Sequence, residues 1–99
     1  MDRHELIIDA DFQDLVPDYL ARRKTELETI GERVEESDFT YLKRLSHDWH
    51  GTGESYGIPF VSEIGEALNR AAKAEDKATI LSLAEKLEQY LAHLDIRYE

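Results

Sequence analysis

The chain contains no cysteine among its 99 residues. Disulfide bonds, thiolate metal sites and thiol nucleophiles are therefore excluded. Without cysteine, the sequence does not indicate whether the protein works in an oxidising or a reducing compartment. The sequence also lacks an apolar run close to the roughly 20 residues that span a bilayer, and its first residues lack the basic start and apolar stretch of a signal peptide. We therefore expect a cytoplasmic protein without direct membrane contact.

Basic residues are scarce, with 12 Lys and Arg against 22 Asp and Glu and a net charge of −10. Binding to nucleic acid requires a clustered excess of Lys and Arg, which this composition does not offer. The only basic run is Arg22-Arg23-Lys24. On a helix such a triplet spreads over most of the circumference, so we predict a solvated face. The charge balance argues against nucleic acid as a partner and favours a partner with a basic contact surface.

Proline and glycine are also few, with two and five residues, and long alternating runs of β-branched residues are missing. This profile predicts an all-α protein, and the length fits a single domain over residues 1–99. Residues 1–8 show no helical periodicity of their own. We expect them to lie across one end of a helical bundle.

Apolar periodicity predicts four amphipathic helices after a short helix that ends near Leu15. The expected ranges are about 17–36, 39–56, 59–75 and 76–98. Pro17 and Pro59 suit the first turns of the first and third long helices, and Gly57 suits the end of the second. Because the connections are short, we predict an antiparallel up-down four-helix bundle with a short additional N-terminal helix.

The second long helix has two different faces. With a period of 3.6 residues, the apolar stripe contains Phe39, Leu42, Leu45, Ser46, Trp49, Gly53 and Tyr56, and the opposite stripe contains Lys43, His47, His50, Gly51 and Glu54. We therefore expect His47 to face water or a partner protein. A side chain beside a glycine is open to approach, and a neutral imidazole is a competent nucleophile.

Other uses of the histidines are less favoured. His47, His50 and Glu54 stand at i, i+3 and i+7 and could direct two nitrogens and a carboxylate along one face, but the sequence offers no second ligand set of the kind a di-iron bundle needs. His4 and His93 are expected to be surface or boundary residues. An ATP site is not predicted, because the glycines of residues 51–57 lack the Walker lysine and a preceding strand.

The segment SHDWHGTGESYG, preceded by a leucine-rich turn and followed by the helical segment EIGEALNRAA, resembles the histidine-containing phosphotransfer (HPt) domain of multistep phosphorelays. In that family a helix carries a histidine, two variable residues, a lysine and a glycine, and a second glycine follows before the next helix. His47 matches the phosphoacceptor, and Gly51 and Gly57 match the two glycines. The resemblance covers nearly the whole chain, although the motif itself is short.

The resemblance implies a phosphoryl carrier without kinase activity of its own. Its partners would be response-regulator receiver domains or a hybrid histidine kinase. The receiver would supply the aspartyl phosphate and Mg²⁺, so this chain would need no cofactor. The outer nitrogen of His47 would accept the phosphoryl group and later pass it to another receiver.

One position departs from the family pattern, because His50 stands where the family usually has lysine. That lysine is thought to stabilise the charge of the phosphoryl group, and a histidine is only partly charged at neutral pH. Lys43, one turn before His47, could supply the charge instead. The departure leaves open a second hypothesis, a helical interaction module that docks a response regulator but transfers no phosphate.

Overall fold

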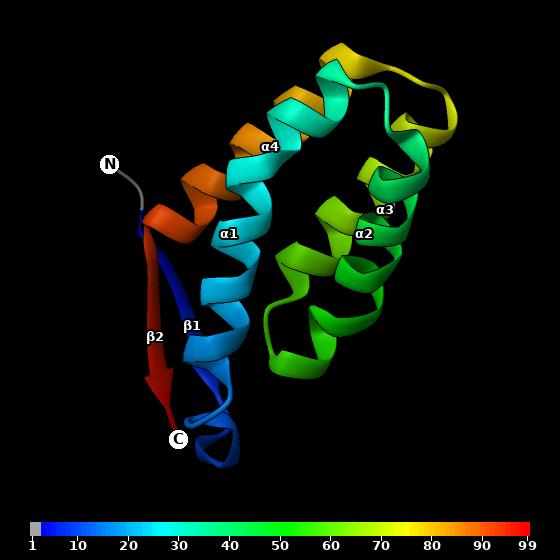
Figure 1. The fold of residues 1–99 in the computed structure, drawn as a ribbon. Helices are drawn as coiled ribbons and strands as arrows, with labels where there is room; N and C mark the ends of the chain where they lie inside the picture. The colour runs from blue at the N-terminus through cyan, green and yellow to red at the C-terminus, as the bar shows by residue number, and fades with distance from the viewer. Residues whose placement is uncertain (1–2) are drawn as a thin grey trace.

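The computed structural model describes residues 3–99 and contains four α-helices and a small two-stranded parallel sheet (Figure 1). The elements are β1 His4–Ile8, the 3-10 turn η1 Ala10–Phe12, α1 Val16–Glu35, α2 Phe39–Thr52, the 3-10 turn η2 Glu54–Tyr56, α3 Pro59–Lys73, α4 Lys77–Ala92 and β2 Leu94–Tyr98. The prediction of a mostly helical chain is therefore confirmed.

Side chains and prolines set the helix starts where the sequence predicts them. Asp38 and Asp76 precede α2 and α4, and each carboxylate accepts a hydrogen bond from a backbone N–H of the first turn. Pro17 and Pro59 lie in the first turns of α1 and α3, where a missing N–H costs nothing. Gly57 has a positive φ of 82°, which glycine adopts without strain, and it turns the chain between η2 and α3.

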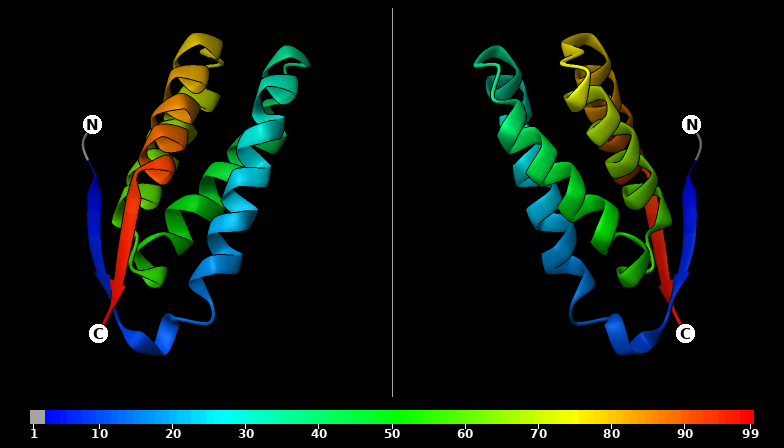
Figure 2. Two further views of the ribbon diagram at one scale, coloured as in Figure 1. Left: turned by 90° about the vertical axis from the view of Figure 1, so that its left-hand side faces the viewer. Right: turned by 90° about the vertical axis from the view of Figure 1, so that its right-hand side faces the viewer.

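The two ends of the chain correct the all-α prediction. Residues 4–8 do not lie across the end of a bundle but form β1, which pairs in parallel with β2 from His4↔Leu94 to Ile8↔Tyr98. Helix α4 ends at Ala92, so Tyr98 belongs to a strand and not to the last helix. Figure 2 shows the two strands side by side along one side of the helices.

Helix α2 is also shorter than predicted. It ends at Thr52 instead of continuing to Tyr56, and the tighter turn η2 follows. The N–H groups of Tyr56 and Ile58 both donate to the carbonyl of Gly53, which ends the α-helical pattern and redirects the chain toward α3.

The core lies between the helices, with α1 in contact with α2 and α4, and α3 in contact with α2 and α4. Its members come from all four helices, the α2–α3 connection and β1; they are Ile8, Val16, Tyr19, Ile30, Val34, Leu42, Leu45, Trp49, Ile58, Val61, Ile64, Leu68, Ala71, Ala72, Ile80, Leu87 and Leu91. Strand β1 contributes through Ile8, which explains why the chain gains from folding its N-terminal end against the helices.

Arg23 contradicts the prediction of a solvated basic run. Arg22 and Lys24 are exposed, but Arg23 is only 1% exposed. Arg23 stands four residues after the buried Tyr19 and four before Leu27, so it belongs to the inward stripe of α1. A buried guanidinium needs partners, and the structure provides them between α1 and α2.

Candidate functional site

Helix α2 presents the exposed face that the sequence predicts. Lys43, His47, His50, Gly51 and Glu54 are all exposed. On the opposite side Leu42, Leu45, Ser46 and Trp49 are buried. The side chain of His47 makes no hydrogen bond or ion pair with any residue in the range 3–99 that the structure describes, so its imidazole is available to a partner.

Small residues bring α2 and α3 into close contact behind this face. A Cβ atom at Gly65 would lie 2.5 Å from the backbone nitrogen of His50 and 2.9 Å from the backbone oxygen of Ser46. A Cβ atom at Gly53 would collide with the backbone nitrogen of Ser62. Because backbone atoms occupy these positions, the two helices can cross this closely only where the side chains are absent.

Ser62 on α3 fastens the end of α2. Its hydroxyl donates to the carbonyl of His50 at 2.9 Å and accepts from the N–H of Glu54 at 2.8 Å. These two bonds satisfy backbone groups in the last turn of α2 and just beyond its end, where intrahelical partners are missing. The close contact and these bonds together fix the position of the exposed face relative to α3.

The imidazole of His50 is directed toward α3. Its Nδ1 lies 3.4 Å from the carbonyl oxygen of Ser62. Because a carbonyl oxygen only accepts hydrogen bonds, Nδ1 is the donor in this contact. The ring lines a surface hollow of about 370 Å³ whose other walls include Glu54, Glu63 and Glu66.

The two glycines of the family motif have different surroundings. At Gly51 a Cβ atom would meet nothing within 4 Å. At Gly57 it would lie 3.2 Å from Ile8 Cγ1 of β1, and the positive φ of 82° strains any other residue. Gly57 therefore serves the turn before α3 and the packing of β1, whereas nothing inside the described chain requires Gly51.

A buried ion-pair network that the sequence reasoning missed anchors α2 to α1 beside His47. The Nε of Arg23 lies 2.6 Å from Glu26 Oε1, and its Nη2 lies 3.4 Å from Asp48 Oδ2. Trp49 donates from Nε1 to the same Glu26 oxygen at 2.8 Å. The guanidinium also lies 4.4 Å from the ring centroid of Tyr19. The residues that follow His47 are thus fixed from behind by α1.

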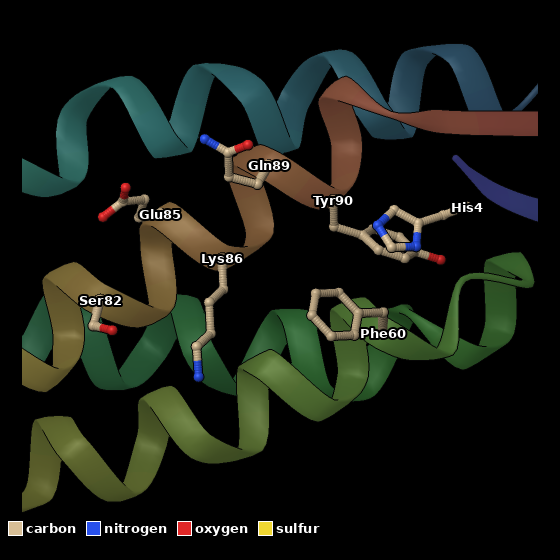
Figure 3. A pocket seen from close by; sticks show the side chains of 7 residues that line it. All are labelled: His4, Phe60, Ser82, Glu85, Lys86, Gln89 and Tyr90. Carbon is tan, nitrogen blue, oxygen red and sulfur yellow. The ribbon is translucent and has the colours of Figure 1, made fainter. Parts of the chain in front are cut away.

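Another surface hollow lies away from the predicted site. It measures about 530 Å³ and is lined by His4, Phe60, Ser82, Glu85, Lys86, Gln89 and Tyr90 (Figure 3). The rings of Phe60 and Tyr90 stack at 4.4 Å between centroids, and the ring of His4 lies 4.6 Å from that of Tyr90. Burial raises the pKa of the Tyr90 hydroxyl, and the nearby charge of Glu63 adds to the shift. His4 is partly buried beside Tyr90, which agrees with the prediction of a surface or boundary residue.

The metal hypothesis gains no support from the arrangement. Within residues 3–99, no three His, Asp or Glu side chains gather so that they could hold a metal ion. His47, His50 and Glu54 share one face but do not form such a group.

His93, at the end of α4, has its Nδ1 2.9 Å from the carbonyl of Gln89.

The helices of the described part of the chain are all too short or too polar to cross a membrane.

No protein-family model matches the sequence, and no curated protein or solved structure is similar enough to match it.

Proposed function

We propose that this chain is a histidine phosphotransfer domain and that His47 is its phosphoacceptor. The observation that carries the proposal is the exposed imidazole of His47 on a helix fixed from two sides, beside a glycine that no internal contact requires. An exposed glycine inside a helix costs about 1 kcal/mol relative to alanine. A receiver domain that must approach His47 closely would explain that cost.

In the proposed transfer, the main chemical contribution of this chain is a nucleophile. The lone pair of the His47 outer nitrogen, Nε2, attacks the phosphorus of an aspartyl phosphate on the receiver. The bond between phosphorus and the aspartate oxygen breaks, and the carboxylate leaves with the electron pair. Mg²⁺ belongs to the receiver and stabilises the transferring oxygens, so the contribution of the α2 face is positioning and charge. The reverse reaction passes the phosphoryl group to a second receiver.

Two side chains on the face are candidates for stabilising the phosphoryl group. Lys43 is exposed one turn before His47, and a lysine side chain is a cation at neutral pH. His50 is one turn after His47, but its Nδ1 is held by the Ser62 carbonyl and three glutamates line the same hollow. We therefore assign the main electrostatic role to Lys43.

We also propose that the helices form an antiparallel up-down bundle, as the helix periodicity and the short connections in the sequence predict. The support is the short connections at residues 36–38, 53–58 and 74–76, together with the contacts that link each helix to two others. The sheet formed by β1 and β2 is an addition to that plan.

Labelling of the histidine tests the proposal. Receiver domains loaded with phosphate from acetyl phosphate are incubated with the protein, and the modified residue is identified by mass spectrometry. We expect an acid-labile, base-stable phosphate on His47 that is absent in His47→Ala and retained in His50→Ala. Labelling at His50 alone would contradict the assignment.

Gly51 allows a matched control for the docking face. Gly51→Gln and Gly31→Gln both place a side chain where the chain has open space, but only Gly51 lies on the α2 face. We expect Gly51→Gln to slow the transfer at least tenfold, a loss of about 1.4 kcal/mol in transition-state stabilisation, while Gly31→Gln leaves the rate unchanged. Equal rates in the two variants would mean that the receiver docks elsewhere.

The contact between His50 and Ser62 favours one second candidate, a docking module that transfers no phosphate. In that case a receiver would bind the α2 face, and Gly51→Gln would weaken the binding, but neither the natural chain nor His50→Lys would be labelled. If His50→Lys is labelled and the natural chain is not, the histidine at position 50 is what prevents the phosphotransfer.

A further inference from the structure

Strand β2 has one unpaired edge. The sheet contains only β1 and β2 in the described chain, so each strand pairs on one side only. The N–H of His4 donates to the carbonyl of His93, and the N–H of Glu99 donates to the carbonyl of Ile8. Because the bonding direction alternates along a parallel strand, the odd-numbered residues of β2 bond to β1. The N–H and C=O groups of Leu94, Ile96 and Tyr98 therefore point away from the sheet.

The side chains of β2 carry a charge pattern that is complementary to itself. Asp95 and Arg97 lie on the outer face of the strand, and the side chain of Arg97 is 71% exposed. In an antiparallel pair centred on Ile96, Asp95 of one copy lies opposite Arg97 of the other, and the reverse pair forms by symmetry. These would be non-hydrogen-bonded positions, where opposing side chains approach most closely.

The same register also satisfies the backbone. It places Ile96 opposite Ile96 of the second copy and Leu94 opposite Tyr98, and these are the residues whose backbone groups point to the free edge. Hydrogen bonding limits the registers to those that pair even-numbered residues with one another, and charge pairing selects among them the register centred on Ile96. A shift by one residue would lose both.

The free edge of β1 is less suited to self-pairing. Its outward backbone groups belong to Glu5 and Ile7. A register centred on Glu5 puts two carboxylates opposite each other, and one that pairs Glu5 with Ile7 puts a carboxylate opposite an apolar side chain. Ile7 is 65% exposed. Its side chain is apolar, so it cannot form the cross-strand charge pair that Asp95 and Arg97 offer on β2.

From these observations we propose that a second copy of this chain binds at the edge of β2. The two β2 strands pair in antiparallel orientation around Ile96 and join the sheets into one four-stranded sheet. Figure 1 shows β2 at the left margin of the molecule and α2 on the right, with α1 between them. The dimer contact therefore leaves α2 outside the interface, and it does not depend on the proposed function.

The association state tests the proposal through Arg97. We expect sedimentation equilibrium to show a reversible dimer of the natural chain. Arg97→Glu reverses one charge in each copy and turns both cross-strand ion pairs into like-charge pairs, so it should raise the dimer dissociation constant at least tenfold. Arg97→Lys keeps the charge and should stay within a few-fold of the natural chain. A natural chain that is monomeric at millimolar concentration overturns the proposal.

A charge swap tests the register. Because Asp95 also bonds Arg3, the variants are made in an Arg3→Gln background. There, Arg97→Asp should weaken the dimer and Asp95→Arg with Arg97→Asp should restore it. A mixed dimer of labelled and unlabelled chains should give a nuclear Overhauser contact between the α protons of Asp95 and Arg97 of different copies. A dimer that ignores these changes, or lacks this contact, pairs elsewhere and refutes the proposal.

Discussion

Replacement of Gly65 by alanine should destabilise the protein, although alanine is the better helix former. The added Cβ atom would lie 2.5 Å from the backbone nitrogen of His50, 2.9 Å from the backbone oxygen of Ser46 and 2.9 Å from the Cβ atom of Trp49. Ordinary contact begins at 3.4 Å. Two of the three atoms belong to the backbone of α2, so no side-chain rotation relieves the clash, and α3 must move away from α2.

The size of the effect follows from two opposing contributions. Alanine in place of glycine gains about 1 kcal/mol of helix propensity. Overpacking of a filled interface costs about 1–3 kcal/mol, and a clash with backbone belongs at the upper end of that range. Retreat of α3 would also stretch the 2.9 Å bond between Ser62 and the carbonyl of His50. We therefore expect a net loss of about 2 kcal/mol in the free energy of unfolding, or roughly 10 °C in Tm.

The assay uses the single tryptophan of the chain, Trp49, which is fully buried at the α2–α3 contact. Urea unfolding followed by Trp49 fluorescence gives the free energy of unfolding for each variant. Gly31→Ala is the matched control, because a Cβ atom there meets nothing within 4 Å. It should stabilise the protein by about 0.5–1 kcal/mol.

The comparison of the two variants is decisive. If Gly65→Ala stabilises the protein as Gly31→Ala does, then α2 and α3 do not cross as closely as described. The rigid presentation of His47 would lose its structural basis, and the proposed role of the α2 face would weaken with it.

Two further changes probe the buried charges and the aromatic hollow. Arg23→Leu should cost about 3 kcal/mol in urea unfolding because it leaves the carboxylate of Glu26 without its cation, and adding Glu26→Gln should recover much of the loss; no recovery would mean that packing, not charge, holds Arg23. Because the pKa of Tyr90 is raised, the folded state keeps that proton more tightly, so its contribution to stability is intact below the ordinary tyrosine pKa of about 10 and is lost as the pH rises from there through the raised pKa of the folded state. In Tyr90→Phe this fall should be smaller, and an identical pH profile of the free energy of unfolding would contradict the assigned burial.

The α2 face shows what a single sequence can predict well. Its two stripes differ strongly in polarity over four turns, and a helix converts that spacing directly into an inner and an outer side. The structure confirms His47, His50 and Lys43 as exposed and Trp49 as buried. Capping residues and prolines likewise gave the helix starts, because they act on the nearest backbone groups.

The parallel sheet was not predictable in the same way. Strands β1 and β2 are five residues each and are separated by the whole helical region, so neither contains local evidence of the other. In the C-terminal segment, Leu91, Leu94 and Tyr98 fit a helical period, while Leu94, Ile96 and Tyr98 fit an alternating one. The contact with β1 decides between these patterns, and that contact is a property of the fold.

Arg23 differs from the sequence prediction for a related reason. Its type suggested solvent, whereas its place in the inward stripe of α1 indicated burial. The partners that make burial tolerable are Glu26 on the same helix and Asp48 and Trp49 on α2. Helix periodicity alone was the correct signal, and the identity of the side chain was the misleading one.

The five glycines of the chain fall into two groups according to their surroundings. Sequence alone cannot separate a glycine that the fold needs from one that a partner needs. The structure assigns Gly53, Gly57 and Gly65 to internal packing, and it leaves Gly31 and Gly51 in open space. Of these two, only Gly51 shares the exposed face of α2 with His47, because Gly31 lies on α1. The open space at Gly51, beside the exposed imidazole of His47, is the feature that the proposed close approach of a receiver to His47 would use.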